Sequence, residues 1–369
     1  MKLVRTFLAF VVFLGACATL SGVDPEEWEG FQIFTNHHVE INVRFDSAEG
    51  RLVLNVFNDD NLTFYQPGES VFWIKDNHLF TLPTPVPEGL STLGEPGDEI
   101  YLLPSSLASG DQERILHGMS GYGLGNNDLV EGTAPMILAD VSGPGDVLLW
   151  LNSDEVYWDT GRPEGEFGFF ENTPGGHHHK TWGFNRRGIH ILTLETEGTV
   201  KATGQPAVTE ATSFLYMIDP RSHEWWQLRH FGFEALKPHA ALDHPSPANG
   251  LPNLISYAFD LDPHSSSLAG MPRPEIRVSD DGEPRLALRH RRPEGDPEKE
   301  TRSDLIYQLE GSENLQSWTP LEEGDENDYR LVSNGEDDDG TPLLLAVLNE
   351  TIEDSPYRFL RFRIVLNSQ

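Results

Sequence analysis

Short runs of residues that alternate between apolar and polar, each ended by turn residues, constrain the fold of this chain most. Residues 39–45 and 51–57 alternate with a period of two on either side of Ala48-Glu49-Gly50, which predicts a β-hairpin. Strands are also expected at the following segments: 70–73, 99–103, 134–140, 146–151, 190–196 and 213–218. So many short strands with turns between them predict a mainly β fold, with a β-sandwich over residues 24–222.

The rest of the chain predicts a second, smaller unit. A chain of 369 residues is long for one hydrophobic core, so we expect two compact units. Over residues 226–369 we expect an α+β module with a short helix at 251–259, in which Pro252 occupies the first turn and Leu254, Tyr257 and Ala258 form the apolar face. Its strands are expected at 285–291, 305–311, 343–348 and 357–366, and the acidic segment 335–340 is expected to be a solvated loop.

The N-terminus has the layout of a secretory signal peptide over residues 1–22. Lys2 and Arg5 precede an apolar run, residues 6–14, that is too short to span a bilayer, and small residues follow it. Residues 14–17 resemble the bacterial lipobox, in which Cys17 would carry the lipid anchor; the alternative is cleavage after Ala18 or Gly22 with Cys17 discarded. Cys17 is the only cysteine, so disulfides are excluded. We expect an exported protein of the cell surface or outer envelope that contacts the membrane only through a lipid anchor.

The charge balance excludes one class of partner. The chain has 59 acidic and 26 basic side chains, a formal net charge of -33. This excess repels nucleic acids and anionic lipids, and it favours solubility in salt and weak attraction of cations. We therefore expect envelope or cell-wall components, or a metal ion, as partners.

The strongest candidate for a chemical site is a group of histidines. In an extended segment His177 and His179 point to the same face, about 7 Å apart, which suits two ligands of one Zn²⁺ or Cu²⁺ ion. His37 or His38 could supply a third ligand if the first strand lies alongside. The alternative is that these histidines are structural or exposed, with Trp182 and Phe184 packing in the core.

Two other kinds of function are weighed against metal binding. A carbohydrate- or wall-binding protein could use tryptophans to stack on sugar rings, although burial in the core is the commoner fate of such side chains; these are Trp150, Trp158, Trp182, Trp225 and Trp226. For catalysis the nearest pattern is residues 118–123, which lack the second glycine of a nucleophile elbow at Tyr122 and are expected to form a Gly-rich loop. The chain has no H-E-x-x-H motif and no P-loop. Carboxylates are too numerous to select a glycosidase pair, so a glycan hydrolase is the least favoured function and no enzyme is predicted.

Residues 175–190 resemble a known signature, G-x-H-x-H-x-x-W-x-F-x-x-x-G-x-Y. This is the pattern of the choice-of-anchor M domain, related to surface-anchored repeats of bacterial cell-wall proteins. Residues 37–41 and 93–104 resemble two further blocks of that family, so the resemblance covers roughly residues 31–218. His190 stands in place of the usual tyrosine. The resemblance implies a bacterial surface protein.

The C-terminal part resembles a second module. Residues 253–263 are similar to the N-L-L-E-Y-A-L-G-L-D-P segment that closes many exported bacterial proteins, and residues 288–292 and 307–318 match its following strand and its Y-x-[VL]-E-x-S-x-x-L-x-x-W block. In that family a calcium-binding loop usually precedes the helix. Here residues 244–250 lack most of the oxygen ligands that calcium needs, so no calcium is predicted there.

Overall fold

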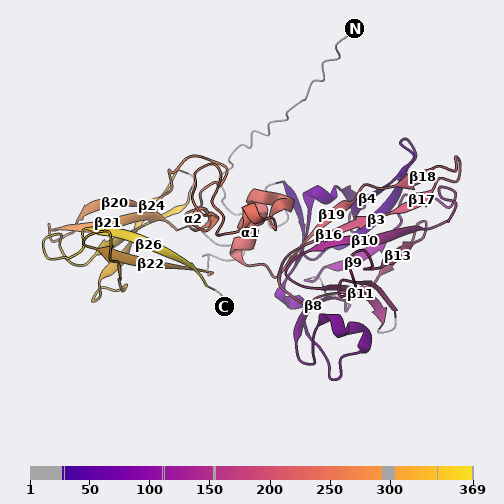
Figure 1. The fold of residues 1–369 in the computed structure, drawn as a ribbon, viewed down its shortest axis with the longest axis horizontal. Coiled ribbons are helices and arrows are strands. Elements are labelled where there is room, and N and C mark those ends of the chain that lie inside the picture. The colour runs from indigo at the N-terminus through magenta and orange to yellow at the C-terminus, as the bar shows by residue number, and fades with distance from the viewer. Residues whose placement is uncertain are drawn as a thin grey trace, which may run out of the picture.

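The computed structural model describes residues 27–28, 30–109, 111, 113–152, 155–292, 304–338 and 340–367. The expected signal peptide at 1–22, the lipobox at 14–17 and Cys17 lie outside these residues. The fold is mainly β, with 45% strand and 11% helix, which confirms the expected fold class (Figure 1). None of the helices in the described ranges is both long enough and apolar enough to span a membrane.

Three sheets make up the first part of the chain. The large sheet has the order β1 (Glu27–Trp28), β2 (Phe31–Phe34), β6 (Ser70–Ile74), β19 (Thr212–Ile218), β16 (Gly188–Glu195), β10 (Ala134–Ser142) and β13 (Phe169–Asn172). A second sheet has the order β12 (Glu155–Asp159), β11 (Val147–Asn152), β15 (Thr181–Phe184), β8 (Glu99–Leu103) and β7 (Leu79–Thr81). The third sheet, called the site sheet below because the candidate site lies on it, has the order β14 (His177–His179), β9 (Leu116–Ser120), β3 (His38–Asp46), β4 (Arg51–Asn58) and β5 (Thr63–Tyr65). A small hairpin pairs β17 (Glu197–Thr199) with β18 (Pro206–Val208).

The C-terminal part has two sheets, and two helices precede them in the chain. One sheet has the order β20 (Arg273–Val278), β21 (Pro284–Arg291), β25 (Pro342–Leu348) and β24 (Tyr329–Glu336), and the other β23 (Thr319–Pro320), β22 (Leu305–Ser312) and β26 (Phe359–Leu366). The helices are α1 (Ser222–Phe231) and α2 (Asn253–Ala258). Short 3-10 turns are η1 (Pro67–Glu69), η2 (Asp76–His78), η3 (Glu88–Leu93), η4 (Gly232–Glu234) and η5 (Pro238–Ala240).

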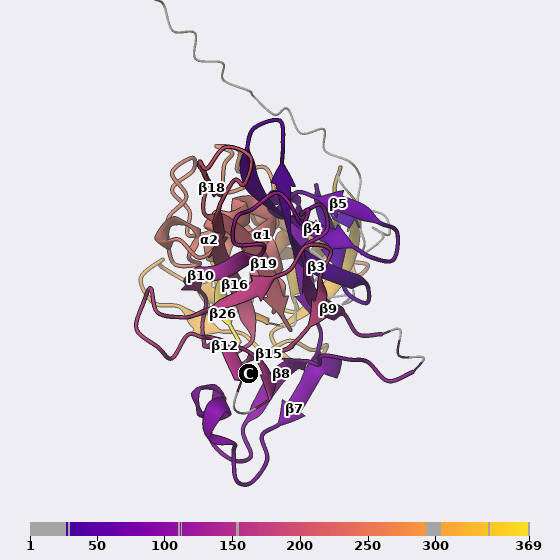
Figure 2. The ribbon, with the colours of Figure 1, turned by 90° about the vertical axis from the view of Figure 1, so that its right-hand side faces the viewer.

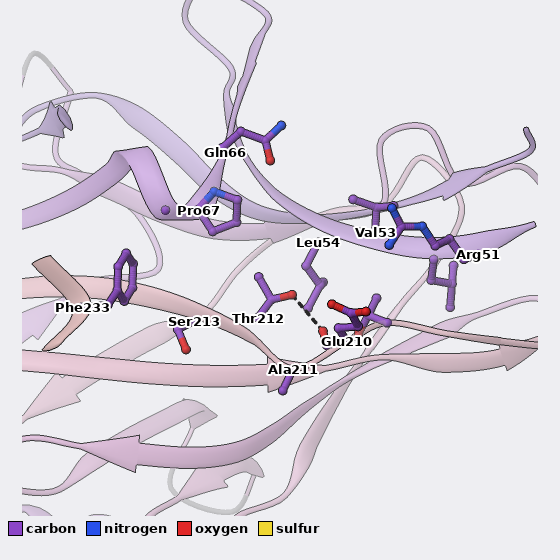
Figure 3. Close-up of a pocket in the computed structure, with 13 residues that line it drawn as sticks. Arg51, Val53, Leu54, Gln66, Pro67, Glu210, Ala211, Thr212, Ser213 and Phe233 are labelled. Carbon is purple, nitrogen blue, oxygen red and sulfur yellow. Dashed lines mark hydrogen bonds between the residues drawn. The ribbon is translucent and has the colours of Figure 1, made fainter. Parts of the chain in front are cut away.

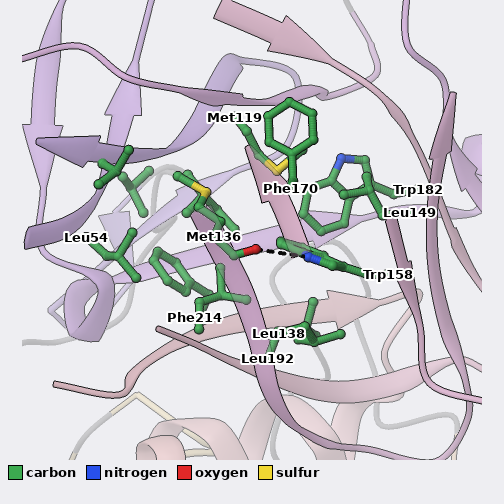
Figure 4. Close-up of a cluster of buried hydrophobic side chains, with 14 of the residues drawn as sticks. Leu54, Met119, Met136, Leu138, Leu149, Trp158, Phe170, Trp182, Leu192 and Phe214 are labelled. Carbon is green, nitrogen blue, oxygen red and sulfur yellow. Dashed lines mark hydrogen bonds between the residues drawn. The ribbon is translucent and has the colours of Figure 1, made fainter. Parts of the chain in front are cut away.

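The large sheet packs through one face against the other two sheets of the first part. Their inward-pointing residues alternate along each strand and form one core, as expected for layered sheets. Trp158 and Trp182 are fully buried there, and the Trp158 indole donates a 3.2 Å hydrogen bond to the Met136 carbonyl (Figure 4). Apolar side chains fill most of these inner faces, where His117 and Tyr216 form a buried polar pair 2.9 Å apart.

Helix α1 covers the other face of the large sheet. Trp225 packs edge-on against Trp73 of β6, with ring centroids 4.8 Å apart, whereas the adjacent Trp226 packs against Tyr257 of α2. Neighbouring tryptophans therefore bury themselves in two different apolar clusters, one on the large sheet and one that includes α2 and β22. Our sequence analysis did not predict this helix.

The strand expectations are confirmed at most positions. The hairpin of 39–45 and 51–57 is β3 paired antiparallel with β4, and a strand is present at every other segment for which the alternation predicted one. The helix expected at 251–259 is the shorter α2, with Pro252 at its N-cap rather than in its first turn. The Gly-rich loop expected over 118–123 is wrong in its first half, because Gly118 to Ser120 belong to strand β9.

Candidate metal centre

The candidate site lies on one face of the site sheet, across three of its strands. His38 and Glu40 are two residues apart on β3, and His177 and His179 are two residues apart on β14, so each pair points to one face. Strand β9 lies between them, paired parallel with β3 and antiparallel with β14 (β3, β4, β5 and β9 are seen together in Figure 2). Side chains from β3 and β14 must therefore meet above β9.

Gly118 makes this meeting possible. It is the residue of β9 that pairs with Glu40 on one side and with His179 on the other. A Cβ atom at position 118 would lie 3.0 Å from the Cε1 and Nδ1 atoms of the His179 ring and 3.0 Å from the His178 carbonyl oxygen. Since neighbouring strands are about 4.8 Å apart, β3 and β14 are separated by about 10 Å, and a side chain at 118 would occupy the space that the site uses.

Three imidazole nitrogens and one carboxylate oxygen converge at this point. The Nε2 atom of His38 is 3.1 Å from Nε2 of His177 and 2.9 Å from Nε2 of His179, and the last two nitrogens are 2.6 Å apart. Glu40 Oε1 is 2.9 Å from His177 Nε2 and 3.4 Å from His38 Nε2. These four residues are a group whose ligand atoms all lie within 4.8 Å of one another.

The Nδ1 atom of each histidine has a partner outside the group. Nδ1 of His38 is 3.2 Å from the Asp59 carboxylate, and Nδ1 of His179 is 3.4 Å from the His117 carbonyl oxygen. Nδ1 of His177 is 3.1 Å from the Tyr122 hydroxyl. Outer partners of this kind orient metal-ligating histidines and fix which nitrogen carries the proton.

The outer partners leave lone pairs facing one another. A carboxylate and a carbonyl only accept hydrogen bonds, so His38 and His179 each hold a proton on Nδ1 and present a bare Nε2 in their neutral forms. Glu40 adds a fully buried carboxylate, of which neither oxygen accepts a hydrogen bond. A proton on one imidazole nitrogen would give one of these atoms a partner. A divalent cation would bind the three Nε2 atoms and the Glu40 oxygen together.

The surroundings shift the pKa values within the group in different directions. Burial raises the pKa of Glu40, but its polar neighbours His38, Ser120 and His177 outweigh this, so the pKa lies below its usual range and the carboxyl is ionised. Burial also lowers the pKa of His179, to about 4, with help from the charges of His38 and His177. For His38 the nearby carboxylates, Glu40 first, outweigh burial and raise the pKa.

The structure brings together most, but not all, of the histidines singled out in the sequence. His38, His177 and His179 meet, whereas His37 is not a member of the group and its ring packs edge-on against Phe34, with centroids 5.6 Å apart. Alternation along β3 explains the difference, because His38 shares a face with Glu40 and His37 does not. Sequence reasoning missed Glu40. The signal that could have found it is the H-x-E spacing of residues 38–40, which mirrors the H-x-H spacing of 177–179.

The residues considered for sugar stacking are in the interior. The exposed fraction of Trp150, the most accessible of them, is 6%, and Trp158 and Trp182 have none. Trp225 and Trp226 are 2% and 3% exposed. None of these five rings offers a flat face to a ligand at the surface.

Ser120 stands at the serine position of the nearest match to a nucleophile elbow, and its hydroxyl has a structural role. Ser120 is fully buried on β9, and its Oγ donates a 2.9 Å hydrogen bond to Oδ1 of Asn42. Asn42 in turn accepts the Tyr122 backbone N–H at 2.8 Å. These bonds hold the loop that brings the Tyr122 hydroxyl to His177.

A separate cavity of about 420 Å³ lies elsewhere on the first part of the chain (Figure 3). Its walls come from β4 (residues 51–54), from residues 209–213 and from Gln66, Pro67 and Phe233. None of the four residues of the metal group lines it. Within its wall the Thr212 hydroxyl donates a 2.9 Å hydrogen bond to the Glu210 carbonyl.

Comparison of the chain with known protein families and with curated proteins found no match in either case.

Proposed function

We propose that this protein binds one divalent transition-metal ion through His38, Glu40, His177 and His179. The observation that carries the proposal is the convergence of three Nε2 atoms, 2.6 to 3.1 Å apart, on a buried carboxylate that accepts no hydrogen bond. A buried ionised carboxylate that no hydrogen bond satisfies is costly, so a site of this composition gains stability when a cation occupies it.

The ligand types select the class of ion. Imidazole nitrogens suit zinc, copper, nickel and iron, whereas calcium and magnesium prefer sites made of oxygen atoms. Asp59 and Asp60 lie beside His38, the first against its ring and the second accepting its backbone N–H at 2.8 Å, so the site is surrounded by negative charge. That charge, with the acidic surface as a whole, attracts cations.

We further propose that the ion is bound outside the cytoplasm, on an exported and lipid-anchored envelope protein without enzymatic activity. The support for this part is the sequence of residues 1–22, with Cys17 at the end of its lipobox-like segment, and the resemblance to choice-of-anchor M proteins. Lipoprotein processing that stops in Cys17→Ser would support it. An unprocessed chain that stays in the cytoplasm would contradict it.

Isothermal titration of the protein without residues 1–22 tests metal binding directly. We expect saturable binding of one zinc ion per chain, lost in the His177→Ala/His179→Ala double variant. His178→Ala is the matched control, because its ring lies on the other face of β14 against Phe170, 5.4 Å between centroids, and should leave zinc binding unchanged. Binding heat no larger than that of the double variant would overturn the proposal. A double variant that only lowers the melting temperature in the absence of metal would instead indicate a structural role.

A further inference from the structure

The distances between the four ligand atoms identify the geometry of the bound ion. With bonds of about 2.1 Å, a tetrahedral ion places all six pairs of ligand atoms about 3.4 Å apart. An octahedral ion places adjacent ligands about 3.0 Å apart and opposite ligands about 4.2 Å apart. The two geometries therefore differ most clearly in the longest pair.

The five shorter pairs average about 3.0 Å, the distance between adjacent positions of an octahedron, and only the pair of Glu40 and His38 reaches the tetrahedral value. The three histidine pairs are 3.1, 2.9 and 2.6 Å apart, and Glu40 is 2.9 Å from His177 and 3.4 Å from His38. Glu40 and His179 are both fully described, and no Glu40 oxygen lies within 4.0 Å of a His179 ring nitrogen, although the ligand atoms lie within 4.8 Å of one another. Glu40 and His179 would thus stand on opposite sides of an ion bound by the four residues.

From this arrangement, and resting on the proposed metal site, we propose that the bound ion keeps two adjacent coordination positions for a small ligand with two oxygen donors. With Glu40 opposite His179, the positions that the protein leaves unfilled are those opposite His38 and His177, and these two are next to each other. The His38 and His177 side chains are 22% and 27% exposed, so solvent reaches the group on the face of the site sheet that is turned away from the core.

Charge narrows the class of ligand. A divalent ion and the Glu40 carboxylate together carry one positive charge, which one negative charge on the ligand neutralises. A second negative charge would be repelled by Asp59, whose carboxylate is 3.2 Å from His38 Nδ1. The site therefore fits a monoanionic chelator such as a hydroxamate or an α-hydroxycarboxylate, with water in both positions when no ligand is present.

Cobalt is the probe for this inference, because tetrahedral Co²⁺ absorbs visible light strongly and six-coordinate Co²⁺ absorbs weakly. We expect the full chain without its signal segment to retain one Co²⁺, by metal analysis, with weak absorption bands. Adding acetohydroxamate should shift these bands and saturate at one equivalent per cobalt, whereas acetamide, which does not chelate, should leave them unchanged. His178→Ala should behave as the unaltered protein.

The outcomes separate this inference from the metal site itself. One retained cobalt with intense tetrahedral bands that do not respond to acetohydroxamate would overturn the two-position inference and leave metal binding intact. Cobalt retained no better than by the His177→Ala/His179→Ala variant would overturn both. A response that also appears in that double variant would mean that acetohydroxamate acts on unbound cobalt, and it would count against the inference.

Discussion

Two buried carboxylates lie against histidines in different regions of this molecule, and they are used differently. Asp304, just before β22, accepts hydrogen bonds from the His223 ring at 2.8 Å, the His223 backbone N–H at 3.1 Å and the Tyr257 hydroxyl at 2.6 Å. Glu40 is fully buried and has three imidazoles around it, yet it accepts no hydrogen bond. Similar residues thus form a network with satisfied hydrogen bonds around Asp304 and one with unsatisfied acceptors around Glu40.

The difference lies in what each carboxylate is turned toward. Asp304 faces donors from α1 and α2, so its bonds join two helices to the start of β22 and need nothing further. Glu40 faces ring nitrogens whose protons are held on the opposite side by Asp59 and the His117 carbonyl. A satisfied network stabilises the fold by itself, whereas an unsatisfied one depends on a cation for its stability.

The largest effect that separates the two sites is expected from Asp304→Ala. Removing one member of a buried, hydrogen-bonded pair should cost about 4 kcal/mol of unfolding free energy, because His223 and Tyr257 lose their acceptor. Without metal, Glu40→Gln should change the free energy of unfolding by less than about 1 kcal/mol, since no hydrogen bond is lost. Urea denaturation in the presence of a chelator measures both. Equal losses in the two variants would mean that Glu40 is structural and that the comparison fails.

Acid should destabilise both regions through their buried histidines. Burial lowers the pKa of His190, in the first part, and of His290, in the C-terminal part, to about 4 in each case. Both are neutral when folded, and the unfolded chain binds their protons below about 6.5, so stability is complete above that pH and is lost as the pH falls towards 4. Each group should contribute about 3 kcal/mol to this loss.

His190→Phe and His290→Phe check the assignment, because phenylalanine keeps a ring of similar size and does not titrate. Between pH 6.5 and 4, each variant should lose about 3 kcal/mol less unfolding free energy than the unaltered protein, because one titrating histidine is gone. Asp304 acts in a lower window, since its lowered pKa gives stability that is present above about 4 and lost below. Unfolding curves that keep the full pH dependence in both variants would exclude these histidines as its source.

Metal should stabilise the protein through Glu40 and not through Asp304. A ligand that binds only the folded state at a hundred times its dissociation constant adds about 2.7 kcal/mol. We expect zinc to raise the unfolding free energy by this amount in the unaltered protein and in Asp304→Ala, and by much less in Glu40→Gln. Thermal unfolding with and without zinc gives the comparison. A full metal-induced rise in Glu40→Gln would remove the carboxylate from the ligand set.

The sequence predicted which side chains share a face of a strand better than it predicted which strands pair with each other. A period of two places His177 and His179 on one face of β14, and the same rule on β3 decides between His37 and His38 once Glu40 is included. What it cannot supply is the pairing of β3 with β9 and of β9 with β14, because these segments are far apart in the chain.

Two features of the site were hidden for specific physical reasons. Glu40 alternates with apolar residues, as Asn42 does, and this pattern is typical of a strand face in solvent, but both side chains are fully buried under the groups that reach over β9. The sequence predicted a loop at Gly118, because glycine weakens strands. It lies within β9 because two neighbouring strands need the space above it, which is a property of the sheet and not of the local sequence.

The smallest expected effect concerns Asp59, which touches the site only through His38. Its carboxylate, 3.2 Å from His38 Nδ1, orients the ring and keeps Nε2 free for the ion, and loss of such an outer partner weakens metal binding by about tenfold or more. Asp59→Asn should therefore lower zinc affinity about tenfold, measured by competition with a chromogenic chelator. Asp60→Asn is the matched control, because Asp60 carries the same charge but accepts the His38 backbone N–H and not the ring. Equal losses in both variants would trace the effect to net charge, and a loss confined to Asp59→Asn would trace it to the orientation of the imidazole.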